Sequence, residues 1–267
     1  MAHFDGRKFR IHYVEEGKGP AVVFVHEVGM DHTMYAAQFE DLPERYRCIA
    51  LDMRGHGRSE TPPAPWSMQD VVVDLIAFIE GTNAAPCHLV GSSWGGMAAL
   101  RVAIQREDLL RSLVLIATSP DAEDPEWVQL YRGYETSVSS GDGVSEDLAR
   151  QTVPIFYGEP FVQREPEAIE IHVDRLTKMP ATAVVEALRM VNDRESMTDR
   201  LGEIRMPALV IHGELDSAVG IARAETLAAG IKGADLVRVQ ETGHTPAVEA
   251  PDVVNEALAG FLARARR

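Results

Sequence analysis

One serine of this chain is placed to act as a nucleophile. Ser93 lies in the run Gly91-Ser92-Ser93-Trp94-Gly95, directly after the apolar residues 87–90. This G-x-S-x-G pattern is typical of a sharp turn from a strand into a helix, on which the serine hydroxyl is exposed. We expect glycine on both sides because the turn leaves no room for side chains, and we expect a strained backbone at the serine. In the alternative interpretation, Ser92 or Ser93 only caps the following helix.

A serine hydroxyl needs a base to accept its proton, and the base needs a group that orients it. His244 is the candidate base, because it follows a predicted strand at residues 234–239 and imidazole titrates near neutral pH. Loops that follow parallel strands gather at the carboxyl edge of a sheet, which is also the expected position of Ser93. Asp216 lies between Ser93 and His244 in the sequence, just after a predicted strand at residues 208–212. We therefore predict Asp216 as the acid that orients His244.

Other interpretations of these residues remain open. Glu214 is closer to the preceding strand than Asp216 is, and it could orient the histidine if the loop turns early. Asp121 follows another predicted strand and is a second rival. Asp216 could also serve as a turn residue or cap for the following helix, which is compatible with the catalytic role. His244 could be an ordinary polar loop residue.

The hydrophobic pattern predicts strands that alternate with helices. Apolar runs and two-residue alternation predict strands at residues 9–15, 21–26, 46–51, 87–90, 113–117, 208–212 and 234–239. Helical spacing and capping signals predict helices at residues 32–41, 67–80, 97–105, 218–229 and 251–263. This alternation predicts an α/β fold, in which helices cover both faces of a mostly parallel sheet.

Residues 121–200 break this alternation. They contain helical patterns at 126–138, 145–151, 166–176 and 181–191 and no clear strand. We interpret this segment as a helical cap inserted into a core formed by residues 1–120 and 201–267. Six aromatic side chains of the cap could line a substrate pocket, although packing between helices is the simpler role for any one of them: Trp127, Tyr131, Tyr134, Phe156, Tyr157 and Phe161.

Composition excludes several classes of function. The 267 residues are 45% hydrophobic and carry a net charge of −15, which argues against partners such as nucleic acids or anionic membranes. The N-terminus lacks the apolar core of a signal peptide and no run reaches membrane-spanning length, so we expect a cytoplasmic protein. Cys48 and Cys87 fall in predicted buried strands and are expected to be core residues. No histidine or cysteine spacing is typical of a metal site, and the oligomeric state is left open.

These motifs and their order resemble the α/β-hydrolase superfamily. The resemblance covers nearly the whole chain outside the cap and rests on the order Ser93, Asp216, His244 and on residues 52–59, 91–96 and 213–216. The chain is similar to the branch of enol-lactonases, esterases and haloperoxidases that carry a short helical cap. Residues 29–35 resemble the corresponding stretch of 3-oxoadipate enol-lactonases. A shared fold does not carry a substrate with it.

The resemblance implies an oxyanion hole made by two backbone N–H groups. One belongs to Trp94 and the other to Val28, in the loop after the predicted strand at residues 21–26. The chain departs from the family at Glu27, because the usual pair at this place is histidine then glycine. A carboxylate that faced the pocket would oppose a developing oxyanion. We expect Glu27 to turn away or to pair with a cation, with a role in proton transfer as the alternative.

The sequence therefore predicts a serine hydrolase of a small carboxylic ester or lactone. Ser93 would form an acyl-enzyme, which water would then hydrolyse. This chemistry requires no metal or cofactor. A hydrolase that cleaves a C–C bond of a ring-cleavage diketone, a perhydrolase, and a ligand receptor with slow turnover are the alternatives on the same fold.

Overall fold

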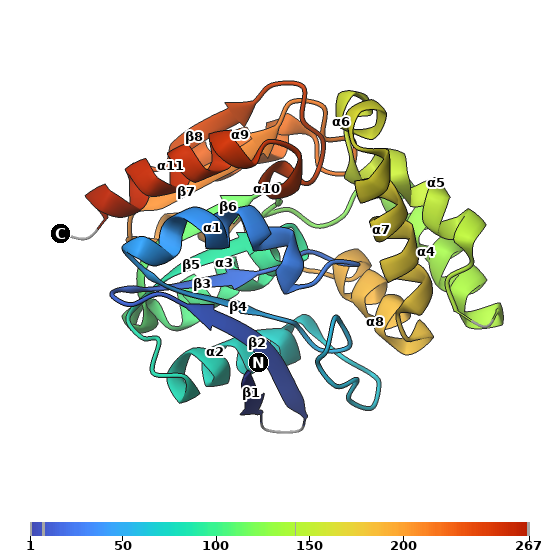
Figure 1. Cartoon of the computed structure of the whole chain (residues 1–267), viewed down its shortest axis with the longest axis horizontal. Helices are drawn as coiled ribbons and strands as arrows, with labels where there is room; N and C mark the ends of the chain where they lie inside the picture. Colours follow the sequence, from blue (N-terminus) through green and yellow to red (C-terminus); the bar gives the residue numbers. More distant parts are fainter. Residues whose placement is uncertain (1, 7–8, 142, 266–267) are drawn as a thin grey trace.

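Eight strands form one sheet in the order β1-β2-β4-β3-β5-β6-β7-β8 in a computed structural model, which describes residues 2–6, 9–141 and 143–265 (Figure 1). β2 pairs antiparallel with β1 and with β4, and every other neighbouring pair is parallel. The strands are β1 (Ala2–Asp5), β2 (Arg10–Glu16), β3 (Ala21–Val25), β4 (Arg47–Leu51), β5 (Cys87–Ser92), β6 (Leu110–Ile116), β7 (Ala208–Gly213) and β8 (Asp235–Val239).

Helices cover both faces of this sheet. α1 packs with α11, and α2 packs with α3 (Figure 1). Every residue of β3, β5 and β7 is buried, as expected for parallel strands with helices on each side. The predicted α/β fold is therefore confirmed. These helices are α1 (Ala36–Asp41), α2 (Met68–Gly81), α3 (Trp94–Gln105), α9 (Ile221–Gly230), α10 (Pro246–Glu249) and α11 (Pro251–Arg264), with short 3₁₀ turns η1 (His32–Tyr35), η2 (Leu42–Glu44), η3 (Glu107–Leu109) and η4 (Thr198–Glu203).

Five further helices lie between β6 and β7 in the chain, and we call residues 125–192 the helical insertion. These helices gather at one end of the sheet, on the right of Figure 1, where α4 packs against α8 and α5 against α7. All four helical patterns predicted in this segment are helices, and α6 was not predicted. The helices are α4 (Pro125–Ser140), α5 (Glu146–Phe156), α6 (Glu159–Arg164), α7 (Pro166–Lys178) and α8 (Ala181–Asn192).

Cys48 and Cys87 are buried free thiols, which confirms their assignment to the core. No helix in the part of the chain that the structure describes has the length and hydropathy needed to cross a membrane.

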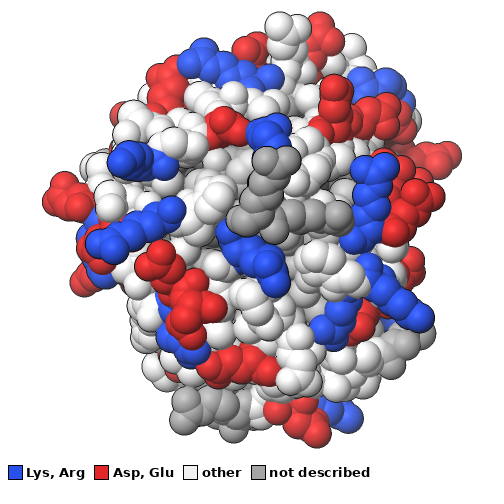
Figure 2. All heavy atoms as spheres, turned by 90° about the vertical axis from the view of Figure 1, so that its left-hand side faces the viewer, with Lys and Arg blue, Asp and Glu red and all other residues white. Residues whose placement is uncertain are grey.

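Figure 2 shows the face on the left of Figure 1, away from the helical insertion. On that face basic and acidic side chains are interspersed, and the described residues form no continuous basic surface there.

Candidate active site

Ser93 lies on the turn between β5 and α3, and its backbone is strained. Its φ is +46° and its ψ is −114°, a region that residues with a side chain rarely adopt. The fold holds this conformation in part through the Ser93 N–H, which donates to the carbonyl oxygen of Ile116 on β6 at 2.8 Å. Ser93 is only 8% exposed, so its hydroxyl group is reached through a cavity and not from the open surface.

Close backbone contacts require the two glycines that flank Ser93. A Cβ atom on Gly91 would lie 2.6 Å from the carbonyl oxygen of Gly95, and one on Gly95 would lie 2.5 Å from that of Val25. Both oxygens belong to the sheet or to α3 and have no freedom to move away. A larger residue at either position would therefore deform the turn, which is the physical reason for the G-x-S-x-G pattern.

His244 and Asp216 meet at the carboxyl edge of the sheet, in the loops that follow β8 and β7. The Nδ1 atom of His244 donates to Oδ2 of Asp216 at 2.8 Å. The other carboxylate oxygen, Oδ1, accepts the backbone N–H groups of Ala218 at 3.0 Å and Val219 at 2.8 Å. Asp216 is thus fixed by its own loop, and it fixes the His244 ring with Nε2 as the nitrogen left to accept a proton.

The structure excludes the two rival acids as partners of His244. Glu214 is exposed at the surface. Asp121 accepts a hydrogen bond from Thr198 and forms an ion pair with Arg223. Only Asp216, among these three carboxylates, contacts the imidazole.

Burial and the surrounding charges set the protonation of this pair. Burial opposes ionisation of Asp216, but His244 and His212 outweigh it and lower its pKa to about 2. Burial also opposes protonation of the His244 ring, but the carboxylates of Asp216, Glu27 and Glu249 outweigh it and raise the pKa of the ring to about 9. The neutral imidazole, which can accept a proton, therefore becomes more abundant as the pH rises.

Ser93 and His244 line the same cavity, which has an empty volume of about 770 Å³ including its solvent-open mouth. Most of its wall is apolar, and no lysine or arginine stands among the described residues that line it. The core also contributes Glu27, Val28 and Ala218. The helical insertion contributes Tyr131, Tyr134, Val138, Val144, Leu148, Thr152, Ile155, Phe156, Leu176, Val184, Leu188 and Val191.

The aromatic side chains of the insertion divide between the cavity and helix packing. Tyr131, Tyr134 and Phe156 line the cavity. Tyr157 and Phe161 stack on each other with ring centroids 5.3 Å apart and are buried. The remaining one, Trp127, packs on the Tyr131 ring at 5.4 Å. Packing is thus the principal role for half of the set.

Glu27 lies beside Ser93 and His244, and the imidazole of His244 is the first of the charged groups that influence it. Glu27 is fully buried and is one of the residues at the cavity wall, with Ser93 and His244. Its Oε2 atom accepts a hydrogen bond from the hydroxyl of Ser92 at 2.8 Å, and no lysine or arginine pairs with it among the described residues. Ser92 thus supports Glu27 and not the nucleophile. In the sequence, Glu27 stood out because glycine is usual at this place. The position of its carboxyl group could not be predicted, because it depends on Ser92, which is 65 residues away in the chain.

Of the two residues predicted for the oxyanion hole, Trp94 directly follows Ser93 and Val28 lines the same cavity as Ser93. Trp94 is the first residue of α3, where a backbone N–H has no acceptor within its own helix. Val28 lies in the loop after β3 and lines the cavity. His26 organises this loop, because its Nδ1 donates to the carbonyl of Glu27 at 2.7 Å and its Nε2 accepts the N–H of Met53 at 2.8 Å.

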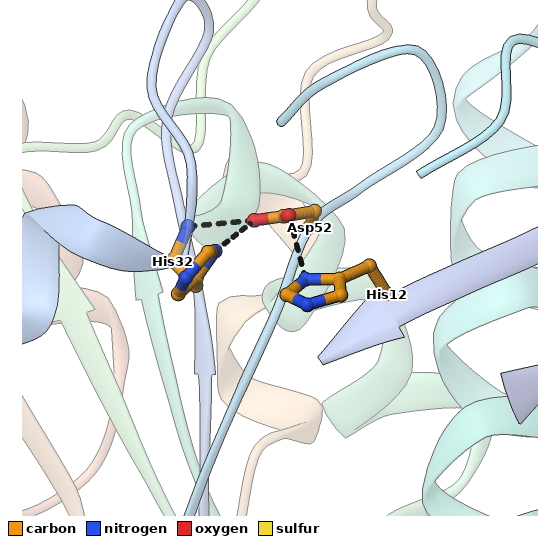
Figure 3. A group of neighbouring side chains, drawn as sticks. All are labelled: His12, His32 and Asp52. Carbon is orange, nitrogen blue, oxygen red and sulfur yellow. Dashed lines mark hydrogen bonds and ion pairs between the residues drawn. The ribbon is translucent and has the colours of Figure 1, made fainter. Parts of the chain in front are cut away.

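A second cluster of polar side chains lies in the core and could, by residue type, hold a metal ion. His12, His32 and Asp52 offer ligand atoms within 4.8 Å of one another (Figure 3). Asp52 Oδ2 accepts from His12 Nδ1 at 3.0 Å and from the Arg58 N–H at 2.9 Å. Its Oδ1 accepts from His32 Nδ1 at 2.8 Å and from the His32 N–H at 2.7 Å. Four donors therefore use both oxygens, and the cluster fits a hydrogen-bonded support for loops better than a metal site.

Residues 22–257 match a model described as the alpha/beta hydrolase family. The chain belongs to the alpha/beta hydrolase family. Membership confirms the resemblance read from the sequence and makes this chain a hydrolase by family.

Relatives and solved structures of this family cover nearly the whole chain. It is 24% identical to 3-oxoadipate enol-lactonase 1 of Acinetobacter baylyi over 91% of this chain and 88% of the lactonase. It is 28% identical to a pimeloyl-[acyl-carrier protein] methyl ester esterase of Chromobacterium violaceum, over 92% of this chain and 95% of the esterase. The structure of a thermophilic esterase from Thermogutta terrifontis matches with a TM-score of 0.93 at 26% identity, over 100% of both chains.

Proposed function

We propose that this hydrolase cleaves small carboxylic esters or lactones through an acyl-enzyme on Ser93. The observation that carries the proposal is the shared cavity: Ser93 and His244 both line it, and Asp216 holds the opposite edge of the His244 ring at 2.8 Å. A hydroxyl on a strained turn, an imidazole and an orienting carboxylate are the groups that acyl transfer requires.

In the first half of the reaction, Oγ of Ser93 attacks the carbonyl carbon and His244 Nε2 takes the hydroxyl proton. The bond to the leaving oxygen then breaks, and His244 returns the proton to that oxygen. In the second half, water attacks the acyl carbon and gives a proton to the same nitrogen. The acid is released when Ser93 regains its proton. Asp216 stays ionised throughout and stabilises the charged imidazole.

Each attack places a negative charge on the carbonyl oxygen. The backbone N–H groups of Val28 and Trp94 are the proposed donors to this oxygen, and each such donor typically contributes about 3 kcal/mol to transition-state stabilisation. Trp94 also opens α3 (Trp94–Gln105), whose positive end favours the same charge.

The cavity wall supports a substrate with a small apolar acyl or alcohol group. Its lining residues are mostly aliphatic and aromatic, and the insertion supplies twelve of them. The insertion would therefore act as the cap that sets substrate size, with residues 121–200 as the cap and 1–120 and 201–267 as the core. The names of two relatives refer to an enol-lactone and a methyl ester, which agrees with this class. A cytoplasmic location remains a prediction.

Hydrolysis of p-nitrophenyl acetate and butyrate tests this function. We expect wild-type protein to turn over both esters and Ser93→Ala to be slower by a factor of about 10³ or more. Ser137→Ala, an exposed serine on α4, is the control for the same chemical change. Undiminished ester hydrolysis by the Ser93 variant would contradict the proposal. Cleavage of a diketone without ester hydrolysis would favour the C–C hydrolase instead.

A further inference from the structure

Glu27 is a buried carboxyl group beside the proposed nucleophile that the mechanism above does not use. It is 0% exposed and lines the cavity with Ser93 and His244. Ser92 donates to Oε2, while Oε1 has no hydrogen-bond partner in the described part of the chain. Burial of a carboxyl group with one oxygen unpaired is unfavourable for folding. The proposed hydrolysis gives no reason for this carboxyl group, because a glycine would leave the turn and the oxyanion donors in place.

The groups that face Glu27 give its surroundings a negative character. The charged ones are His244, from the loop after β8, Asp216, from the loop after β7, and Glu249 on α10. Two neutral phenols also lie within its electrostatic reach, those of Tyr35 and Tyr157. His244 can accept the Ser93 proton only when its imidazole is neutral. In that form, the imidazole carries no positive charge that could offset the carboxylates.

Basic side chains do not compensate for this charge at the cavity wall. No lysine or arginine is among the described residues that line it. Arg175 affects the pKa of Tyr157 but is engaged with Asp31 at 3.2 Å. Arg194 affects that of Tyr131 but pairs with Glu123 at 2.7 Å. A substrate carboxylate in this cavity would therefore meet like charge and no partner.

We propose that Glu27 is a specificity-determining residue that excludes substrates bearing a carboxylate and confines the site to uncharged esters and lactones. This inference rests on the function proposed above. Two like charges would, at an assumed separation of about 8 Å and an effective dielectric constant of about 20, repel enough to reduce kcat/KM roughly tenfold or more. Burial raises the pKa of Glu27 to about 7, with His244 and Ser92 acting in the opposite direction. The repulsion is therefore weak in mildly acidic solution and grows as Glu27 ionises.

A matched pair of substrates tests this role. p-Nitrophenyl hexanoate and the mono-p-nitrophenyl ester of adipic acid have acyl chains of the same length and differ in a terminal carboxylate, which stays ionised above pH 6. Both substrates react through the same base, His244. The fraction of protein with a neutral His244 therefore cancels in the ratio of their kcat/KM values. In wild-type protein, we expect the adipate-to-hexanoate ratio to fall roughly tenfold between pH 6 and pH 9. In Glu27→Gln, which is nearly isosteric, the ratio should be independent of pH and equal to the wild-type value at low pH.

Two further variants keep the test informative. Ser92→Ala retains the carboxyl group but removes its donor, so the fall in the ratio should move to higher pH. Glu214→Gln makes the same chemical change at an exposed carboxylate outside the cavity and should reproduce the wild-type profile. A ratio that does not change with pH in wild-type protein, with hexanoate still cleaved through Ser93, would overturn the inference alone. Failure to cleave either ester through Ser93 would overturn the proposed function and the inference with it.

Discussion

The Nδ1 atom of His244 lies 2.8 Å from Oδ2 of Asp216, although 28 residues separate them in the chain. The contact fixes the imidazole tautomer, because a carboxylate only accepts hydrogen bonds. Asp216→Asn would replace that acceptor with an amide and favour the wrong tautomer, so we expect kcat to fall by about 10³ to 10⁴ with little change in KM. Steady-state kinetics with p-nitrophenyl butyrate measures this directly.

The same variant should change the pH profile in a known direction. Burial disfavours the charged imidazole, but the neighbouring carboxylates outweigh it and raise the pKa of His244 to about 9. Wild-type kcat/KM should therefore still be rising above pH 7, because the base is active only when neutral. Loss of the Asp216 charge lowers that pKa and moves the acidic limb to lower pH. Glu214→Gln should leave the limb in place, and an unmoved limb in the Asp216 variant would argue against His244 as the base.

The backbone strain at Ser93 predicts a difference in stability between two inactive variants. Both Ser93→Gly and Ser93→Ala lack the hydroxyl group, but only glycine adopts a φ of +46° without steric conflict. We expect the glycine variant to be more stable by about 1 kcal/mol, after allowance for the greater freedom of glycine in the unfolded chain. Urea denaturation gives the two free energies of unfolding. An alanine variant more stable by about 1 kcal/mol, which the freedom of glycine in the unfolded chain would explain by itself, would show that the turn is not strained.

Asp52 should contribute to stability in a pH-dependent manner. Burial disfavours its charge, but His32, His26 and the backbone donors outweigh it and lower the pKa of this carboxyl well below its usual range. Asp52→Asn replaces one acceptor oxygen with an amide NH₂ group, which would face hydrogen-bond donors. We expect this change to reduce the free energy of unfolding at pH 7 by about 2 to 4 kcal/mol.

The sign of the pH effect follows from that depressed pKa. The stabilisation is complete above the unfolded pKa of about 4 and is lost as the pH falls toward the folded value. The difference between wild-type protein and the Asp52 variant should therefore shrink on acidification. Figure 3 shows the hydrogen bonds of Asp52 to His12 and His32. A constant difference between pH 7 and pH 3 would contradict an ionised Asp52 held by these bonds.

The sequence was sufficient for the features that leave a local signal. Apolar runs identified the buried strands of the parallel sheet, and the capping pair Ser67 and Asp70 marked the start of α2, where both reciprocal hydrogen bonds form. The loop order brought Asp216 and His244 to one edge, because parallel strands carry their following loops to the same side of a sheet.

Features that depend on distant contacts were missed. β1 (Ala2–Asp5) is a short, partly exposed edge strand that forms by pairing with β2, with Ala2 opposite Tyr13. α6 (Glu159–Arg164) is too short to show helical periodicity and is held by the stacking of Phe161 on Tyr157. The predicted helix at residues 32–41 is divided into η1 (His32–Tyr35) and α1 (Ala36–Asp41).

The hydrogen-bond partners of Glu27 and Asp52 were not predicted, for the same reason. Glu27 accepts a hydrogen bond from Ser92 on β5, and Asp52 accepts hydrogen bonds from β2, η1 and the loop after β4. Neither arrangement has a local pattern, because each joins residues that only the folded sheet brings together.

The most direct measurement of the central claim is active-site labelling. A fluorophosphonate probe reacts with an activated serine, and mass spectrometry of the digested protein identifies the modified residue. We predict one phosphonylated site, Ser93, with labelling abolished in Ser93→Ala and strongly reduced in Asp216→Asn. Modification at another serine, or undiminished labelling after loss of Ser93, would contradict the account.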